Sequence, residues 1–180
     1  MNFNENCRVL IVDEEPTNLR VLVDSLKGSY ECLTATDGKT ALELARKASP
    51  DLILLDIMMP GMDGYEVCRQ LKEDKQTESI PIILATAMNQ MEDEKKGLDL
   101  GAADYVVKPF RIPILMRRVR HQILFKKQQD ALKLALDDNK ELLHILCHDL
   151  VNPIFAIQNL VTLLDHCPED KFEHYVRLID

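Results

Sequence analysis

Polar residues with reactive side chains stand at or just after the ends of four short apolar runs. They comprise a carboxylate, an acidic pair, a hydroxyl and an ammonium: Asp56, Asp13, Glu14, Thr86 and Lys108. Singly, each has an ordinary role as a cap, a solvated charge or a strand former, but together they favour a shared site. A carboxylate accepts a phosphoryl group as a nucleophile, and an ammonium neutralises the phosphoryl oxygens. Because gathered carboxylates repel one another, a hard cation such as Mg²⁺ is expected among them.

The elements that must position these residues alternate along the chain. Five short runs, most of them rich in Val, Ile or Leu, predict strands at 8–12, 31–35, 51–55, 81–85 and 103–107. Segments with apolar residues at helical spacing predict helices at 16–28, 38–48, 64–74 and 89–100. This alternation predicts an α/β fold, an open parallel sheet covered on both faces. Ligands of such sheets bind at the carboxyl ends of the strands, so the polar residues are expected to converge there.

The 180-residue chain has a formal net charge of −8, and the acidic excess lies in its first part. Residues 1–110 hold 12 basic against 20 acidic residues, whereas residues 111–180 hold 10 of each. The acidic first part argues against nucleic acid or an anionic membrane as its partner. The five cysteines lack CxxC spacing, the start of the chain is polar and no apolar stretch approaches membrane-spanning length, so a cytoplasmic protein without a membrane segment is expected.

Four stretches of the chain resemble the receiver domain of two-component response regulators. They are IVDEEPTN (11–18), DLILLDIMMPGMDGYE (51–66), PIILATA (81–87) and GAADYVVKPF (101–110). The resemblance covers roughly residues 6–126. It implies a flavodoxin-like, doubly wound, five-stranded parallel sheet with strand order 2-1-3-4-5.

The resemblance also implies a role for the residues of the predicted site. Asp56 corresponds to the phosphoacceptor, and Lys108 corresponds to the residue that contacts the phosphoryl group. Asp13 and Glu14 correspond to the acidic pair that holds Mg²⁺ with Asp56. The backbone carbonyl of Met58 corresponds to a further ligand of the metal.

Thr86 and Tyr105 correspond to the switch hydroxyl and the switch aromatic ring of the family. The peptide bond from Lys108 to Pro109 is expected to be cis, which only a proline bond readily allows. The implied phosphodonor is a histidine kinase or a phosphotransfer protein.

The chain departs from the usual pattern of this family beside the predicted site. Glu14 stands where many receivers have a second Asp; its extra methylene shifts the metal site slightly, and Mg²⁺ binding is expected to survive. Met58 and Met88 flank the site at positions that influence loss of the phosphoryl group in the family. Neither side chain orients an attacking water, so a relatively long-lived aspartyl phosphate is hypothesised.

A helical pattern continues with scarcely a break from about 111 to 166. From Leu132 its repeating positions alternate spacings of four and three, which is a heptad seam: Leu132, Leu136, Asn139, Leu143, Leu146, Leu150, Pro153, Ile157, Leu160 and Leu164. The sheet domain alone cannot bury so long a stripe, so a homodimer through this helix is expected. Asn139 either fixes the register of the pair or is merely tolerated there.

His148 lies on the face of this helix that points away from the seam. An exposed imidazole there is either an ordinary surface side chain, one half of a metal-binding pair with His144, or a nucleophile toward phosphorus. Residues 147–157, CHDLVNPIFAI, resemble the H-box of sensor histidine kinases. This resemblance implies that His148 is a phosphoacceptor and that Asp149 assists its proton transfer.

Two domains are expected: a receiver over residues 1–126, and a helical dimerisation and histidine phosphotransfer segment over 127–180. CPED at 167–170 predicts the turn of a helical hairpin whose second helix, from about 171, is much shorter than the first. The chain is therefore expected to be a fragment of a longer protein. No ATP-binding segment follows, so this chain alone is not expected to be an active kinase, and the enzymatic status of the whole protein stays open.

The favoured function is a receiver that regulates an attached histidine kinase dimerisation domain, as in hybrid histidine kinases. The alternative is a phosphorelay intermediate or a dimeric scaffold without an ATP-binding domain. The residues encoded after Asp180 would separate the two. A DNA-binding transcription factor is disfavoured because 111–180 show no helix-turn-helix pattern.

Overall fold

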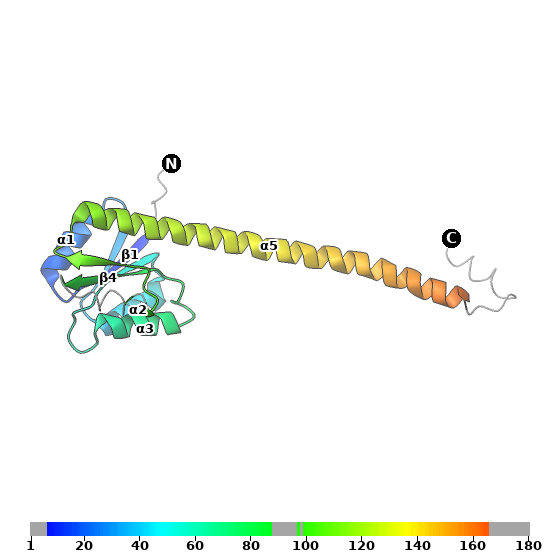
Figure 1. Ribbon diagram of the computed structural model, residues 1–180, viewed down its shortest axis with the longest axis horizontal. Helices are drawn as coiled ribbons and strands as arrows, with labels where there is room; N and C mark the ends of the chain where they lie inside the picture. The colour runs from blue at the N-terminus through cyan, green and yellow to red at the C-terminus, as the bar shows by residue number, and fades with distance from the viewer. Residues whose placement is uncertain (1–6, 88–96, 98, 166–180) are drawn as a thin grey trace. The chain divides into compact units, whose positions relative to one another are not determined.

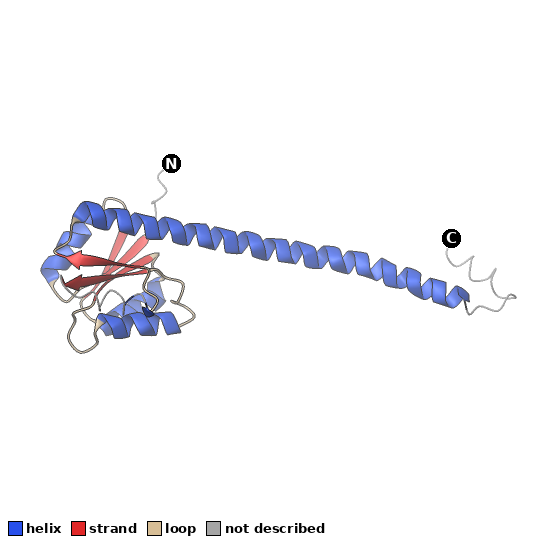
Figure 2. Cartoon of the chain, in the orientation of Figure 1, coloured by secondary structure: helices blue, strands red, loops and turns tan. Residues whose placement is uncertain are grey.

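The structure, a computed structural model, describes residues 7–87, 97 and 99–165. The chain divides into two compact units, Met1–Gln129 and Asp130–Asp180, and the sheet with its covering helices belongs to the first. Figure 2 distinguishes the helices from the strands, which follow in the order β1 (Arg8–Val12), α1 (Pro16–Leu26), β2 (Glu31–Ala35), α2 (Gly38–Ala48), β3 (Leu52–Asp56), α3 (Gly64–Glu73), β4 (Ile82–Ala87), β5 (Asp104–Lys108) and α5 (Ile112–Asp165).

The five strands form one parallel sheet with the order β2-β1-β3-β4-β5, which confirms the predicted topology. β3 is central, with Leu54 opposite Ile11 of β1 and Ile83 of β4. Every residue of β3 is buried, which explains its continuous apolar run, because helices cover both faces of a parallel sheet. Each fully buried Leu or Ile stabilises the fold by about 1.5–3 kcal/mol.

The core has two layers, one on each face of the sheet. One layer packs α2 and α3 against the side chains of alternate strand residues such as Leu10 and Ile53. The other layer packs α1 and the first turns of α5 against the intervening residues, such as Ile11 and Leu54. The side chains of a strand alternate between faces, so each strand contributes to both layers. α1 and the first turns of α5 thereby cover one face, and α2 and α3 cover the other (Figure 1).

Local sequence signals set the starts of the helices near the strand ends. Asp37 and Asp63 cap α2 and α3 by accepting from the backbone amides of Thr40 and Glu66. Gly64 opens α3 directly against the end of β3, where a Cβ atom would lie 2.2 Å from the carbonyl oxygen of Asp56. Only glycine allows α3 to approach Asp56 this closely.

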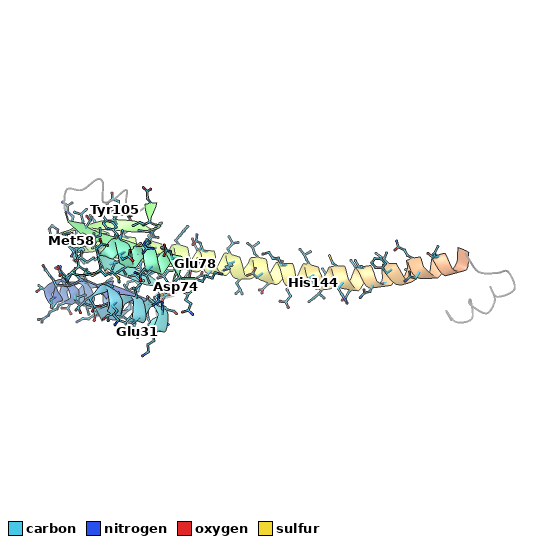
Figure 3. All side chains as sticks on the ribbon, turned by 90° about the horizontal axis from the view of Figure 1, so that it is seen from below. Glu31, Met58, Asp74, Glu78, Tyr105 and His144 are labelled. Carbon is cyan, nitrogen blue, oxygen red and sulfur yellow. The ribbon has the colours of Figure 1, made fainter. Side chains whose placement is uncertain are left out.

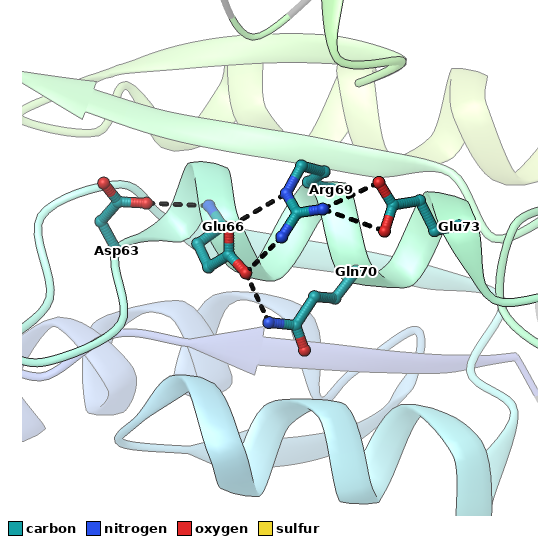
Figure 4. Close-up of polar contacts among 5 residues, drawn as sticks. All are labelled: Asp63, Glu66, Arg69, Gln70 and Glu73. Carbon is teal, nitrogen blue, oxygen red and sulfur yellow. Dashed lines mark hydrogen bonds and ion pairs between the residues drawn. The ribbon is translucent and has the colours of Figure 1, made fainter.

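The exposed face of α3 carries a network of charged side chains around Arg69 (Figure 4). The Arg69 guanidinium donates to the carboxylates of Glu66 and Glu73, and the amide of Gln70 donates to Glu66 at 2.6 Å. These pairs are three or four residues apart on an exposed helix. They are therefore screened by solvent and do not determine the fold.

The predicted long helix is confirmed as α5, which extends over 54 residues with Pro153 inside it. The side chains of residues 130–155 are exposed in the single chain. Among the described helices, none is both long enough and apolar enough to cross a membrane. Met88, the predicted turn at 167–170 and the helix from about 171 lie outside the described residues, as does most of the predicted helix 89–100.

Candidate functional site

Lys108 joins two buried carboxylates at the carboxyl end of the sheet. Its ammonium nitrogen lies 2.6 Å from Oδ2 of Asp56 and 2.7 Å from Oδ2 of Asp13. The carboxylates are almost completely removed from solvent, since Asp13 is 1% exposed and Asp56 is 3% exposed. The structure therefore brings together three of the residues that the sequence singled out.

The parallel topology explains how residues so far apart in the chain meet. Asp13 directly follows β1, Asp56 ends β3 and Lys108 ends β5, and all three strands point the same way. β1 and β3 are neighbours, so the two carboxylates lie side by side, and the long side chain of Lys108 reaches both. The peptide bond from Lys108 to Pro109 is cis, as predicted.

The electrostatics of the cluster follow from two carboxylates sharing one ammonium. Burial raises the pKa of the Asp56 carboxyl, Lys108 acts against that rise, and the neighbouring Asp13 adds to it. Burial acts against the charged form of Lys108, but its hydrogen bonds to Asp13 and Asp56 outweigh burial and raise its pKa. The ammonium of Lys108 thus does not fully offset the effect of burial on Asp56. A further positive charge would therefore stabilise the ionised carboxylates of the cluster.

The donor set fits a hard divalent cation. Oxygens of Asp13 and Asp56 already converge on one positive group, and the backbone amide of Met58 lies 3.3 Å from Oδ1 of Asp56. Glu14 is exposed, and among the described residues no three His, Cys, Asp or Glu side chains are grouped closely enough to hold a metal by themselves. Two carboxylates completed by backbone oxygen and water match the preference of Mg²⁺, which keeps several waters.

Asn18, to which the sequence analysis gave no role, fixes the Asp13 carboxylate. Its amide nitrogen lies 3.0 Å and 3.1 Å from the two Asp13 oxygens. The backbone amide of Glu15 donates to Oδ1 of Asp13 at 2.9 Å. Asn18 lies in the first turn of α1, five residues after Asp13, so its position inside the stretch 11–18 was the available signal.

Replacing Asn18 by alanine is expected to weaken Mg²⁺ binding about tenfold, because residues that orient metal ligands typically contribute 10–100-fold to affinity. The Asp13 carboxylate would lose a donor to both of its oxygens. Isothermal titration with Mg²⁺ measures the effect, and Thr17→Ala, at an exposed neighbouring position, is the control. Equal Mg²⁺ affinities of Asn18→Ala and the wild type would refute this role.

The remaining residues predicted for the receiver site lie on β4, on β5 and just after β3. Thr86 is buried on β4, directly after Ala85, which stands opposite Asp56 in the register. Tyr105 is half-buried on β5, and its ring faces the guanidinium of Arg118 at 5.7 Å. Met58, two residues after Asp56 in the chain, has a side chain that is 66% exposed. Figure 3 labels Met58 and Tyr105.

His148 lies in the second unit, on an exposed part of α5. Its Nδ1 is 3.3 Å from a carboxylate oxygen of Asp149, and its Nε2 is 3.2 Å from the amide nitrogen of Asn152. Figure 3 labels His144 on the same helix. Among the described residues, no group of three or more His, Cys, Asp or Glu side chains that could hold a metal ion includes either histidine, so the zinc alternative gains no support.

Comparisons with known proteins show which domains this chain is similar to. The protein-family model described as response regulator receiver domain matches residues 9–120 of this chain. Response regulator PleD of Caulobacter vibrioides is 46% identical over 129 residues, which are 71% of this chain and 28% of PleD. This chain therefore spans only about a quarter of that relative.

Solved structures show the same similarity. A putative response regulator from Chloroflexus aurantiacus is 33% identical, with a TM-score of 0.64 over 66% of this chain and 98% of that one. The receiver domain of the sensor histidine kinase PA1611 from Pseudomonas aeruginosa is 30% identical, with a TM-score of 0.61 over 66% of this chain and 98% of its own. The latter structure has a magnesium ion coordinated in its active-site cleft. The match over residues 9–120, more than half of the chain, shows that this protein belongs to the response regulator receiver domain family.

Proposed function

We propose that Asp56 accepts a phosphoryl group from a phosphohistidine of a histidine kinase or phosphotransfer protein. The observation that carries this proposal is the direct bridge from Lys108 to the buried carboxylates of Asp56 and Asp13. A buried carboxylate at the rim of the sheet is a nucleophile, and an adjacent ammonium is ready to meet the incoming charge. Receiver membership supports the same two-component role.

The transfer is a single displacement at phosphorus. A carboxylate oxygen of Asp56 forms the new P–O bond while the P–N bond of the phosphohistidine breaks. The leaving ring nitrogen keeps the electron pair, and a phosphohistidine protonated at its other nitrogen leaves as neutral imidazole. Lys108 moves from pairing with the free carboxylate to pairing with phosphoryl oxygens, and Thr86 donates its hydroxyl to another of them.

Mg²⁺ is the cofactor of this proposal. Asp13 and Asp56 would hold it with the backbone carbonyl of Met58, and Glu14 would act through an intervening water, since its side chain is exposed. When bound, the ion neutralises charge on the phosphoryl oxygens. The magnesium-containing receiver of the relative PA1611 supports this assignment.

The direct test is intact-mass measurement after incubating the chain with a small phosphodonor, with and without Mg²⁺. One added phosphoryl group that requires Mg²⁺ and maps to the peptide containing Asp56 is the supporting result. No addition, or addition at another residue, would contradict the proposal.

We further propose that residues 1–126 form the receiver and that residues 127–180 belong to a histidine kinase dimerisation segment in which His148 is a phosphoacceptor. The exposed imidazole beside Asp149 supports this assignment, because a phosphoacceptor must be reachable and Asp149 is placed to accept a proton from the ring. Phosphorylation of Asp56 would shift Thr86 and Tyr105 and so act on α5, which leads to His148. A cytoplasmic location fits this role.

A second candidate is a receiver that controls a different output. The similarity to PleD, a response regulator by name, favours it. Transfer of phosphoryl groups from a phosphorylated partner to this chain distinguishes the two. If the wild type is labelled at two sites and His148→Ala at only one, the kinase segment is supported. Labelling confined to Asp56 supports another output or a scaffold.

The second unit is proposed to pair with a second copy of the chain. Six of the seam residues are large apolar side chains that are exposed in the single chain: Leu132, Leu136, Leu143, Leu146, Leu150 and Ile157. Further exposed apolar residues lie beside the seam, among them Leu142, Ile154 and Val161. A helix with apolar side chains over so much of its surface is typically buried. Contact with a single partner helix along the seam would therefore leave part of this apolar surface uncovered.

Replacing Leu146 by lysine is expected to weaken the dimer by at least about tenfold, because it places a charge in the seam. Sedimentation of the 180-residue chain over a range of concentrations measures the dissociation constant. Gln158→Lys adds the same charge outside the seam and is expected to leave the dimer intact. A wild-type chain that stays monomeric throughout would rule out this pairing.

A further inference from the structure

Two side chains of α5, one turn apart, hold the first part of β5. Arg118 forms an ion pair with the Asp104 carboxylate, and its guanidinium lies 5.7 Å from the centre of the Tyr105 ring. Gln122 donates from its side-chain amide to the backbone carbonyl of Ala103 at 3.3 Å. These five residues are called the β5–α5 clamp below.

The clamp is built on a fixed base. Leu115 and Val119 flank Arg118 on α5 and are buried against the sheet at 1% and 0% exposure, so the backbone that carries Arg118 is held in place. Asp104 is held as well, since the Oδ1 atom that pairs with Arg118 also accepts from the backbone amide of Tyr105 at 2.8 Å. The Tyr105 ring lies against this pair, and a change of its side-chain rotamer would take it away from Arg118 without moving the backbone.

We propose that Arg118 is a positioning residue for Tyr105 and thereby restrains phosphorylation of Asp56. This inference rests on the proposed function, in which Tyr105 shifts when Asp56 is phosphorylated. The stack of Arg118 on the ring is present in the conformation where Asp56 accepts directly from Lys108. A contact that stabilises only this conformation opposes its conversion to the conformation in which Tyr105 has shifted.

The same contact connects the site to α5. Movement of the Tyr105 ring away from Arg118 removes the cation–π contact, while the ion pair of Arg118 with Asp104 remains. A pocket of about 520 Å³ is lined by both Tyr105 and Arg118, so the side chains have room to rearrange without displacing the core. Phosphorylation of Asp56 would then change the contacts of Arg118 on α5.

Removing the guanidinium is expected to favour the shifted conformation. The cation–π contact is made only while the Tyr105 ring lies against Arg118, whereas the ion pair with Asp104 persists in both conformations. Loss of the cation–π contact alone is expected to make Arg118→Ala phosphorylated about 2–5-fold faster than the wild type. Arg118→Lys keeps the charge opposite Asp104 but lacks the planar face, and its rate should fall between the two. Arg120→Ala removes an exposed charge from the same helix and should react at the wild-type rate.

The experiment measures the rate of phosphoryl addition by intact mass on the 180-residue chain and its variants, with a small phosphodonor and Mg²⁺. Nuclear magnetic resonance follows the clamp itself: the ring current of Tyr105 shields the side-chain protons of Arg118, and Tyr105→Leu provides the unshielded reference. Beryllofluoride with Mg²⁺, a phosphoryl mimic, is expected to remove this shielding in the wild type.

Two results would overturn the clamp while leaving the proposed function in place. In one, Asp56 is phosphorylated normally but Arg118→Ala reacts no faster than the wild type or than Arg120→Ala. In the other, beryllofluoride binds but Arg118 remains shielded. Absence of any phosphoryl group on wild-type Asp56 is a different outcome, which would overturn the proposed function and the clamp with it.

Discussion

Replacing Asp56 by asparagine is expected to abolish phosphorylation of the chain by a small phosphodonor, reducing the rate by at least about a hundredfold. The amide oxygen of asparagine is a poor nucleophile, and the remaining carboxylate of Asp13 is held by Lys108, Asn18 and the backbone of Glu15. Intact mass with peptide mapping measures the outcome. Persistent single phosphorylation of Asp56→Asn would place the acceptor elsewhere.

Asp63→Asn is the matched control for this experiment. Asp63 lies seven residues after Asp56 and caps α3 by accepting from the backbone amide of Glu66, a role that asparagine also fills. Its phosphorylation is expected to equal that of the wild type. A loss in both variants would indicate a general effect of lost negative charge, and a loss only in Asp56→Asn assigns the nucleophile.

The Asp56→Asn chain should fold at least as stably as the wild type. Burial and the neighbouring Asp13 raise the pKa of Asp56 despite Lys108, so the folded state disfavours the ionised carboxylate. A raised pKa means that the contribution of this group to stability is greatest at low pH and is lost as the pH rises through the folded value. The advantage of the asparagine is therefore expected at neutral pH and should fade in acid.

Replacing Lys108 by methionine is expected to destabilise the fold by about 2–4 kcal/mol at neutral pH, because it leaves Asp13 and Asp56 buried without a counter-charge. The Lys108 side chain is 23% exposed, and this partial solvent contact reduces the loss. Its pKa is raised, so Lys108 is charged and its full contribution is present throughout the neutral range. Urea denaturation measures the difference.

The destabilisation of Lys108→Met should be reversed by whatever lowers the negative charge of the cluster. Adding Mg²⁺ should stabilise this variant more than the wild type, because the ion takes over the role of the ammonium. The double variant Lys108→Met with Asp56→Asn should recover part of the loss, since one carboxylate remains. Lys39→Met, at an exposed position on α2, is the control. A Lys108→Met chain as stable as the wild type would show that the bridge from Lys108 to the two carboxylates contributes nothing to stability.

Much of the first unit was predictable from the pattern of apolar residues. The five runs became the five strands, and every residue of the apolar run in β3 is buried. The helical spacing from 111 onward predicted α5, and the resemblance of four stretches supplied the strand order. These features are local or are shared across a family, and apolar periodicity reports directly which face of an element is buried.

The site was predictable as a set of residue types but not as a set of contacts. Placing polar residues at strand ends follows from the topology, so the meeting of Asp56 with Lys108 was expected in outline. Asp13 and Glu14 were predicted with equal standing as an acidic pair, yet the structure buries Asp13 in the cluster and leaves Glu14 exposed. Asn18 received no role because its partner is determined by how the loop turns into α1.

The sequence by itself thus determined which elements form, which faces they bury and which residue types gather at the carboxyl edge of the sheet. Only the tertiary structure decided that Lys108 bridges both carboxylates, that Asn18 orients Asp13 and that Arg118 joins Asp104 to the ring of Tyr105. The physical reason is the separation along the chain of the residues that interact. Periodicity records the environment of each residue one at a time, whereas a hydrogen bond or ion pair between distant residues depends on strand register, loop path and side-chain rotation, which are set jointly when the whole chain packs.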